Sequence, residues 1–293
     1  MPNLGYHDNR SYTDTAYVDL KFYRTGRNGR VKAIEPSQAG NTLYLGAEVE
    51  NDHYPTTAAR DRAVTYTRET ATWARCESDG SLVNGFEIVS APITLAAHKA
   101  TDWAGLFNKL EQLGGKAHDT DTCGLHVHVS RAALGNTDDA KALCIAKMCE
   151  FVERFQQELS CFARRDIAAS YWCSPTGYGH SVTDGSRALR RKANNLQSRQ
   201  GINCHDSNRY HAINLQNRST VEFRIFRGTL KPETFYATLT LVDGIVRWCK
   251  QHTTPEIHTL TWDGFLAWVN DETLTGYWAT RRRYAHQFQA YAA

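Results

Sequence analysis

The chain has 293 residues, of which 41% are hydrophobic and 22% charged, and its formal net charge is +3. This composition is typical of a globular protein with a full core, and so small a net charge does not by itself indicate binding to nucleic acid or membranes. The polar start of the chain shows no secretory signal, and no apolar run is long enough to span a bilayer. We therefore expect a cytoplasmic protein.

Eight cysteines are scattered along the chain without any C-x-x-C pair, which argues against a structural zinc site. Cys144, Cys149 and Cys249 lie among apolar residues of expected helices. We expect these three to be reduced thiols that pack in the core.

In chain order, strands are expected first. Residues 16–23 and 30–35 predict a hairpin, and a strand over residues 42–50 follows a loop. Residues 73–90 predict two strands that turn at Asp79-Gly80-Ser81, because Asp, Gly and Ser favour tight turns.

Helical spacing of apolar residues predicts a helix over about 95–113, which Gly114-Gly115 stops. After a strand at 123–130, Thr137 opens a long helix that extends to about residue 162. Residues 163–208 lack periodicity and are rich in Gly, Ser, Asn and Arg, which is typical of a functional loop.

A second hairpin pairs about residues 209–216 with 219–227. Pro232 then begins another helix, because proline is well tolerated in a first helical turn. Two shorter helical pieces rich in Trp and Tyr finish the chain. Antiparallel strands mix with helices and show no βαβ rhythm, so the sequence predicts an α+β fold.

The stretch S-T-V-E-F-R-I-F-R-G-T-L at 219–230 carries the most informative pattern. Alternation places Val221, Phe223 and Ile225 on one face of a strand, and the other face then holds Thr220, Glu222 and Arg224. A carboxylate beside a guanidinium is either a plain surface pair or a metal ligand next to a phosphate clamp.

Three other strands have a similar polar face, which carries Glu48 and Glu50, then Glu87, then His126 and His128. Solvent-exposed faces usually mix Thr, Lys, Ser and Gln. These faces together hold four Glu, two His, one Arg and no Lys at their central positions. We therefore expect the four faces to converge on one site.

Converging carboxylates need a counter-charge. Two of them about 5 Å apart repel by roughly 3 kcal/mol at an effective dielectric constant of 20, so they raise each other's pKa values or bind cations. Oxygen-rich sites suit Mg²⁺ or Mn²⁺ better than zinc. Arg224 would then donate to a phosphate held by the metals, a combination used in phosphoryl transfer.

Four pieces of the chain together resemble the amidoligase family over about residues 42–250: G-A-E-V-E, the D-G-S turn followed by F-E-I-V-S-A-P, C-G-L-H-V-H-V-S, and T-V-E-F-R-I-F. Members of that family are carboxylate–amine ligases, frequent in bacteria and their phages and related to glutamine synthetase and glutamate–cysteine ligase. The resemblance implies a glutamine-synthetase-like curved antiparallel sheet, with helices on the outer face and the active site on the concave face. Residues 1–41 would be an N-terminal hairpin extension and residues 42–293 the catalytic domain, with substrate and nucleotide loops at about 163–208.

The resemblance also implies a role for each polar residue. Divalent ions would be held by Glu48, Glu50, Glu87, His126 and Glu222. Arg224 would contact the transferred phosphate, and His128 would be either a further metal ligand or a phosphate contact. Arg209 and Arg227 are either further clamps for phosphate or substrate carboxylate, or ordinary surface arginines. Glu77 and Asp79 lie near the site in sequence, although turn chemistry explains Asp79 equally well.

The implied activity is ATP-dependent amide-bond formation with Mg²⁺ or Mn²⁺. ATP would phosphorylate a substrate carboxylate to an acyl phosphate, and an amine would then displace the phosphate. Arg224, Arg227 and Arg209 would act in catalysis. Arg224, His128 and Arg209 would bind the nucleotide. The partners would be small or peptide-like acids and amines, with no membrane and with nucleic acid only as a modified substrate.

Two other readings of the sequence stay open. One is a metal-dependent hydrolase that uses the His126 and His128 pair with Glu48 or Glu87. The other is a nucleic-acid-binding protein that uses the basic runs Arg187–Lys192 and Arg281–Arg283. Glutamates on the central strands argue against the second, because they would repel a phosphate backbone.

Overall fold

The computed structural model describes residues 42–118, 120–167, 170, 211–215, 217 and 220–284. It also describes the backbone of three two-residue strands, at 5–6, 17–18 and 33–34. Arg209, most of the predicted loops at 163–208 and the basic run 187–192 lie outside the described residues.

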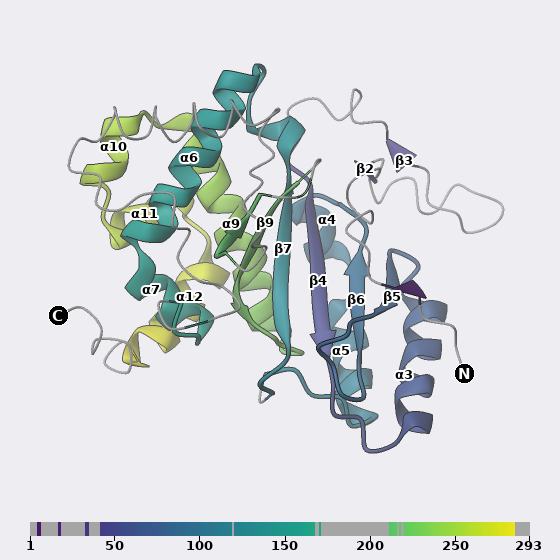
Figure 1. Ribbon diagram of the computed structural model, residues 1–293. Helices are drawn as coiled ribbons and strands as arrows, with labels where there is room; N and C mark the ends of the chain where they lie inside the picture. The colour runs from purple at the N-terminus through teal and green to yellow at the C-terminus, as the bar shows by residue number, and fades with distance from the viewer. Residues whose placement is uncertain are drawn as a thin grey trace.

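A seven-stranded sheet with the order β1-β5-β6-β4-β7-β9-β8 forms the centre of the fold (Figure 1). Its strands are β1 (Gly5–Tyr6), β4 (Leu45–Asn51), β5 (Ala74–Ser78), β6 (Phe86–Ser90), β7 (Gly124–Ser130), β8 (Ile213–Asn214) and β9 (Thr220–Arg227). All neighbours pair antiparallel except β1 and β5, which are parallel. The four strands predicted to carry polar faces, β6, β4, β7 and β9, are therefore adjacent.

Two further short strands, β2 (Tyr17–Val18) and β3 (Ala33–Ile34), pair antiparallel within the spans predicted for the N-terminal hairpin. Around the main sheet lie helices α3 (Thr57–Thr70), α4 (Leu95–Ala100), α5 (Trp103–Gln112), the 3₁₀ turn η2 (Arg131–Leu134), α6 (Asp138–Arg154), α7 (Gln156–Ala163), α9 (Pro232–Gln251), α10 (Thr254–Thr259), α11 (Trp262–Val269) and α12 (Glu272–Arg281). Strands and helices alternate irregularly along the chain, so the predicted α+β class is confirmed.

Several helix boundaries differ from the prediction. The helix expected over 95–113 is two helices, because Asp102 accepts a hydrogen bond from the N–H of Gly105 at 2.8 Å and so begins α5 separately from α4. The helix expected up to 162 breaks at Phe155, whose ring packs 4.7 Å from that of Phe151. Three helices rather than two follow α9 within residues 252–284. Helix α3 was not predicted at all, because its buried stripe is short and consists mostly of small residues.

Two predicted helix starts are confirmed. The Thr137 hydroxyl accepts a hydrogen bond from the N–H of Ala140 at 3.1 Å and so caps α6. Pro232 is the first residue of α9.

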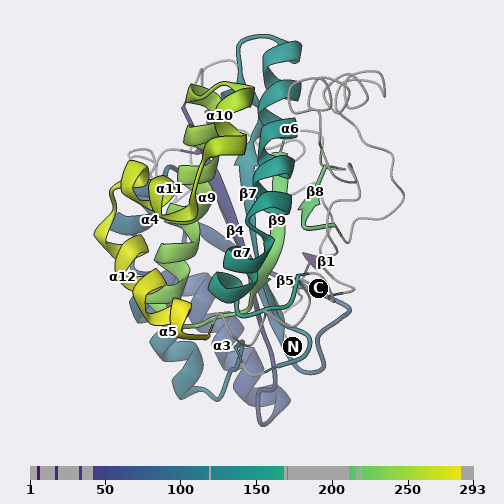
Figure 2. The same ribbon diagram turned by 90° about the vertical axis from the view of Figure 1, so that its left-hand side faces the viewer.

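The hydrophobic core lies between the apolar face of the sheet and the helices. Val127, Val221 and Phe223 are fully buried, as the alternation of β7 and β9 predicts. Figure 2 shows α4, α5 and α9 on one side of the sheet. Trp103 of α5 and Phe235 of α9 join these helices with a ring-centroid distance of 4.3 Å. The strands are thereby held from the side opposite to their polar residues.

The six cysteines within the described residues are all buried and free, which confirms the expectation for Cys144, Cys149 and Cys249. Among the helices of the described part, none combines the length and the apolar composition that crossing a membrane requires.

Candidate metal and phosphate site

Strand pairing brings the predicted residues together in adjacent rows of one face. Glu50 lies opposite Glu87 across β4 and β6, and Glu48 lies opposite His126 across β4 and β7. His128 lies opposite Glu222 across β7 and β9. Opposite residues share a face of the sheet, so residues up to 174 positions apart in the sequence (48 and 222) meet at one place.

A bulge between β7 and β9 adds an arginine to this face. Leu125 lies opposite Phe226, whereas Val127 lies opposite Phe223, so β9 carries one extra residue where β7 carries only His126. The extra residue shifts the alternation, and Arg227 comes to lie opposite Gly124, on the same face as Arg224. The local alternation of β9 does not show this shift.

Two groups of three side chains can each hold a metal ion, and Glu48 belongs to both. The first group is Glu48, Glu87 and His126, and the second is Glu48, His128 and Glu222; within each, the ligand atoms all lie within 4.8 Å of one another. All five side chains are buried, with at most 7% of their surface exposed. Each group offers two carboxylates and one imidazole, a donor set that fits Mg²⁺ or Mn²⁺.

Glu48 lies between the two histidines. Its Oε2 is 3.2 Å from Nδ1 of His126, and its Oε1 is 3.0 Å from Nε2 of His128. Glu222 lies slightly farther away, at 3.6 Å from His126 Nδ1 and 3.9 Å from His128 Nε2. One carboxylate therefore links the two groups, which makes Glu48 the central residue of the site.

The two imidazoles differ in electrostatic environment. Burial lowers the pKa of His126, and the Arg224 guanidinium lowers it further, so that the pKa stays below its usual value despite Glu48 and Glu222. Burial also opposes charge on His128, but Glu48 and Glu222 outweigh it and raise the pKa of that imidazole. The site thus favours a neutral His126, the form that binds metals, beside a more basic His128.

Glu50 shows the repulsion by a neighbouring carboxylate that the sequence predicts. Burial is the main reason why the pKa of Glu50 is well above its usual value, and the charges of Glu87 and Asp79 raise it further. Oε2 of Glu50 accepts a hydrogen bond from the N–H of Gly124. Glu50 belongs to neither metal-binding group among the described residues, so its role as a ligand stays a prediction.

Arg224 lies directly beside the metal-binding residues. Its Nη1 donates a hydrogen bond to Oε1 of Glu222. Burial disfavours the charged guanidinium, but Glu222 and Glu48 outweigh burial and raise the pKa of Arg224, so it remains a cation. The same guanidinium, together with His128, holds the pKa of Glu222 below its usual value although burial raises it.

Glu77, Asp79 and Arg281, which the sequence also named, lie outside the two metal-binding groups. Glu77 lies opposite Glu87 and forms an ion pair with Arg75. Asp79 accepts a hydrogen bond from the N–H of Ser81 at 2.6 Å, which confirms the turn. Arg281, from the second basic run, lies near the end of α12 and stacks on the ring of Tyr277 at 4.7 Å.

The structure adds site residues that the sequence did not predict. The side-chain amides of Asn214 and Asn217 donate to Oε2 of Glu222 at 2.8 and 3.2 Å. The Thr220 hydroxyl lies 3.0 Å from Nδ1 of His128. Alternation places Thr220 on the polar face. Asn214 lies in the short strand β8 directly opposite Glu222, whereas Asn217 lies outside the strands, where alternation gives no signal.

Asp52 fixes the ends of three strands near the site. Its carboxylate accepts hydrogen bonds from the N–H groups of Val83 and Asn84, at 2.9 and 2.7 Å, and from the hydroxyl of Thr122 at 3.2 Å. Burial raises the pKa of Asp52, but these and other main-chain donors outweigh it and lower the pKa. Gly85 is required nearby, because a Cβ there would lie 2.1 Å from the carbonyl oxygen of Asn51.

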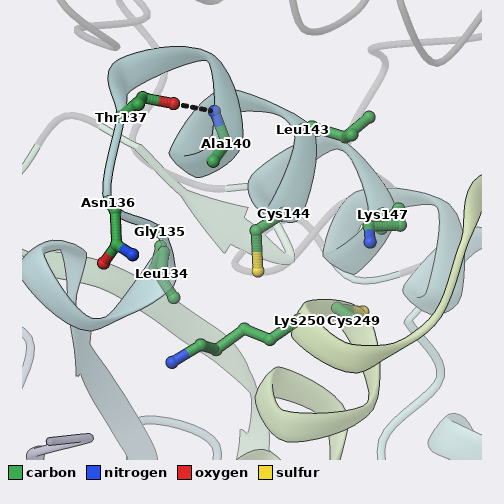
Figure 3. Close-up of a pocket in the computed structure, with 10 residues that line it drawn as sticks. All are labelled: Leu134, Gly135, Asn136, Thr137, Ala140, Leu143, Cys144, Lys147, Cys249 and Lys250. Carbon is green, nitrogen blue, oxygen red and sulfur yellow. Dashed lines mark hydrogen bonds between the residues drawn. The ribbon is translucent and has the colours of Figure 1, made fainter. Parts of the chain in front are cut away.

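A separate pocket of about 450 Å³ lies among the helices (Figure 3). It is lined by Leu134, Gly135, Asn136, Thr137, Ala140, Leu143, Cys144, Lys147, Cys249 and Lys250. The ammonium of Lys147 donates to the carbonyl of His252 at the end of α9, at 2.6 Å. None of the predicted site residues lines this pocket, so it is distinct from the polar face of the sheet.

A protein-family model described as "Putative amidoligase enzyme" matches residues 57–246, which is more than half of the chain. The chain belongs to the amidoligase family. The family match includes β6, β7 and β9 with their polar residues and begins after β4, so Glu48 and Glu50 lie outside it. None of the curated proteins compared with this amidoligase matches it.

This match confirms the family resemblance of the sequence. It supports an enzyme with a ligase activity. Ligases generally depend on a nucleotide and a metal. The buried Glu and His groups of this amidoligase fit the metal.

Proposed function

We propose that the protein is an ATP-dependent carboxylate–amine ligase that forms an amide bond through an acyl phosphate. One observation carries this proposal: Glu48, Glu87, Glu222, His126 and His128 gather on one buried face, and Arg224 lies beside them. A polyanionic nucleotide requires cations, and this site combines two groups suited to divalent ions with a permanent cation.

The residues divide the proposed reaction between them. Glu48, Glu87, Glu222, His126 and His128 would hold Mg²⁺ or Mn²⁺, which would neutralise charge on the nucleotide phosphates. Arg224 would donate to the oxygens of the phosphoryl group that moves from ATP to the substrate carboxylate. Arg227, which shares this face, would bind the carboxylate of the acid. The neutral amine would then attack the acyl carbon, phosphate would leave with the C–O bond electrons, and the proton lost by the amine would pass to the released phosphate.

Burial of these carboxylates is compatible with a ligase. Glu48 and Glu222 are 3% and 2% exposed, so bulk water has little access to the centre of the site. An acyl phosphate hydrolyses in water, and a ligase must keep it from water until the amine attacks. The antiparallel order of β6, β4, β7 and β9, with helices on the opposite face, is compatible with the glutamine-synthetase-like sheet that the resemblance implies.

The test is release of ADP by the full chain with Mg²⁺ and panels of glutamate-like acids and of amines. We expect ADP only when acid and amine are both present, and transfer of ¹⁸O from labelled acid to phosphate. Glu222→Gln should lower the rate at least about 100-fold. Arg247→Gln, on α9 and paired with Asp243, is the matched control that should not.

Turnover that needs metal but no nucleotide would contradict the ligase proposal. It would favour the metal-dependent hydrolase, the second candidate, because Glu48 contacts both histidines as a hydrolase centre would require. If wild type and Glu222→Gln released ADP at equal rates, the active site would not lie on this face of the sheet.

A further inference from the structure

Arg131 is a buried arginine that connects the end of β7, the strand of His126 and His128, to the start of β9 and the residues before it. It follows β7 directly and is 7% exposed. Its Nε donates to the carbonyl oxygens of Asn217 and Thr220, both at 2.9 Å, and its Nη2 donates to that of Leu215 at 2.7 Å. One planar guanidinium therefore fixes three main-chain oxygens between the end of β8 and the first residue of β9.

The residues that Arg131 fixes are the same ones that orient two predicted metal ligands. Asn217 donates its side-chain amide to Oε2 of Glu222 at 3.2 Å. Thr220 places its hydroxyl 3.0 Å from Nδ1 of His128. Arg131 thus acts on Glu222 and His128 together, through one neighbour of each.

These contacts restrict how each ligand can face a metal. Asn214 also donates to Oε2 of Glu222, at 2.8 Å, so two amides hold that oxygen and set the plane of the carboxylate. In His128, Nε2 lies 3.0 Å from Oε1 of Glu48. Because Nδ1 contacts Thr220, Nε2 is the ring nitrogen that faces the two carboxylates of this metal-binding group and would coordinate the ion.

We propose that Arg131 and Asn217 are positioning residues, which set the orientation of Glu222 and His128 for a divalent cation. This inference rests on the proposed metal site. Residues that orient metal ligands in this way typically change metal affinity about 10- to 100-fold when they are removed. Lysine cannot replace Arg131, because an ammonium lacks the planar fork that reaches three carbonyls.

The test is titration of Mn²⁺ into the full chain by calorimetry, with the electron paramagnetic resonance spectrum of bound Mn²⁺ as a second readout. Asn217→Ala should weaken Mn²⁺ binding about 10- to 100-fold and alter the spectrum. Arg131→Lys should weaken it at least as much. Asn84→Ala is the matched control, because its amide makes one comparable hydrogen bond, to the carbonyl of Tyr54 at 2.7 Å. It should bind Mn²⁺ like wild type.

The outcomes separate this inference from the proposed function. If wild type binds no Mn²⁺, the metal site fails and the positioning roles fail with it. If wild type binds Mn²⁺ and Asn217→Ala binds it equally well, with an unchanged spectrum, only the positioning roles are overturned. If Asn84→Ala weakened Mn²⁺ binding as much as Asn217→Ala, the positioning roles would also be overturned, because the loss would then reflect a general destabilisation of the fold. Should Arg131→Lys fold poorly, Asn217→Ala decides the matter.

Discussion

At the scale of single residues, Glu48 and Glu50 look equivalent in the sequence and differ in the structure. Both project from β4 toward the polar face, two positions apart. Glu48 contacts both histidines and belongs to both metal-binding groups, whereas Glu50 accepts the N–H of Gly124 and belongs to neither. We therefore expect substitution of these two residues to affect metal affinity differently.

Glu48→Gln should weaken Mn²⁺ binding by at least about 100-fold, which is about 2.8 kcal/mol, because it removes an anionic ligand from both groups. Glu50→Gln should weaken it less, since a glutamine oxygen can still accept the hydrogen bond from Gly124. Calorimetric titration of both variants measures the difference. An effect of Glu50→Gln as large as that of Glu48→Gln would instead make Glu50 a direct ligand, as the family resemblance implies.

Whether the sequence could predict a site residue depended on the secondary structure in which the residue lies. Glu48, Glu87, His126, His128, Glu222 and Arg224 sit on strands whose period of two assigns each side chain to a face. Asn217 lies outside the strands and Arg131 begins the short 3₁₀ turn η2, so the alternation of a strand places neither side chain. The contacts of Arg131 join positions 84 to 89 residues apart, so no local pattern could indicate them, whereas Asn217 reaches Glu222 from only five positions away.

At the scale of secondary structure elements, α9 packs closely against α11. A Cβ on Gly244 of α9 would lie 2.8 Å from Cγ2 of Val269 and 3.4 Å from Cζ of Phe265. Gly276 of α12 has no such neighbour, because nothing lies within 4 Å of an added Cβ. The two helical glycines form a matched pair for testing whether this contact is tight.

Gly244→Val should lower the free energy of unfolding by about 1–3 kcal/mol, because the larger side chain overpacks the interface. Gly276→Ala should leave it unchanged or raise it by up to about 1 kcal/mol, because alanine favours helix more than glycine. Urea denaturation followed by circular dichroism measures both. A Gly244→Val variant as stable as wild type would show that α11 can move away from α9 at little cost.

At the scale of the whole molecule, the sheet order concentrates carboxylates that repel one another in a buried place. The high pKa of Glu50, caused by burial and by Glu87 and Asp79, is one sign of this repulsion. A cation that binds the folded protein, and not the unfolded chain, stabilises the fold by mass action. The site should therefore couple metal binding to global stability.

We expect Mn²⁺ or Mg²⁺ to raise the melting temperature of the wild-type protein and a chelator to reverse the rise. At a metal concentration 100 times the dissociation constant, the stabilisation is about 2.7 kcal/mol. Differential scanning calorimetry measures the shift, and Ca²⁺ serves as a comparison for size selectivity. The Glu48→Gln variant should show little or no rise; an undiminished rise in that variant would place the ion elsewhere.

By itself, the sequence determined the α+β class, the positions of the main strands and the face of each strand residue outside the bulge in β9. It could do so because side-chain alternation and turn chemistry are local properties. Only the tertiary structure decided that β6, β4, β7 and β9 are neighbours, that a bulge brings Arg227 onto the shared face, and that Arg131, Asn214 and Asn217 hold the site. The strand order, the bulge and the contacts of Arg131 depend on hydrogen bonds between distant segments, which leave no local periodicity in the chain. The two asparagines lie within eight residues of Glu222, but their contacts form only when β8 pairs with β9.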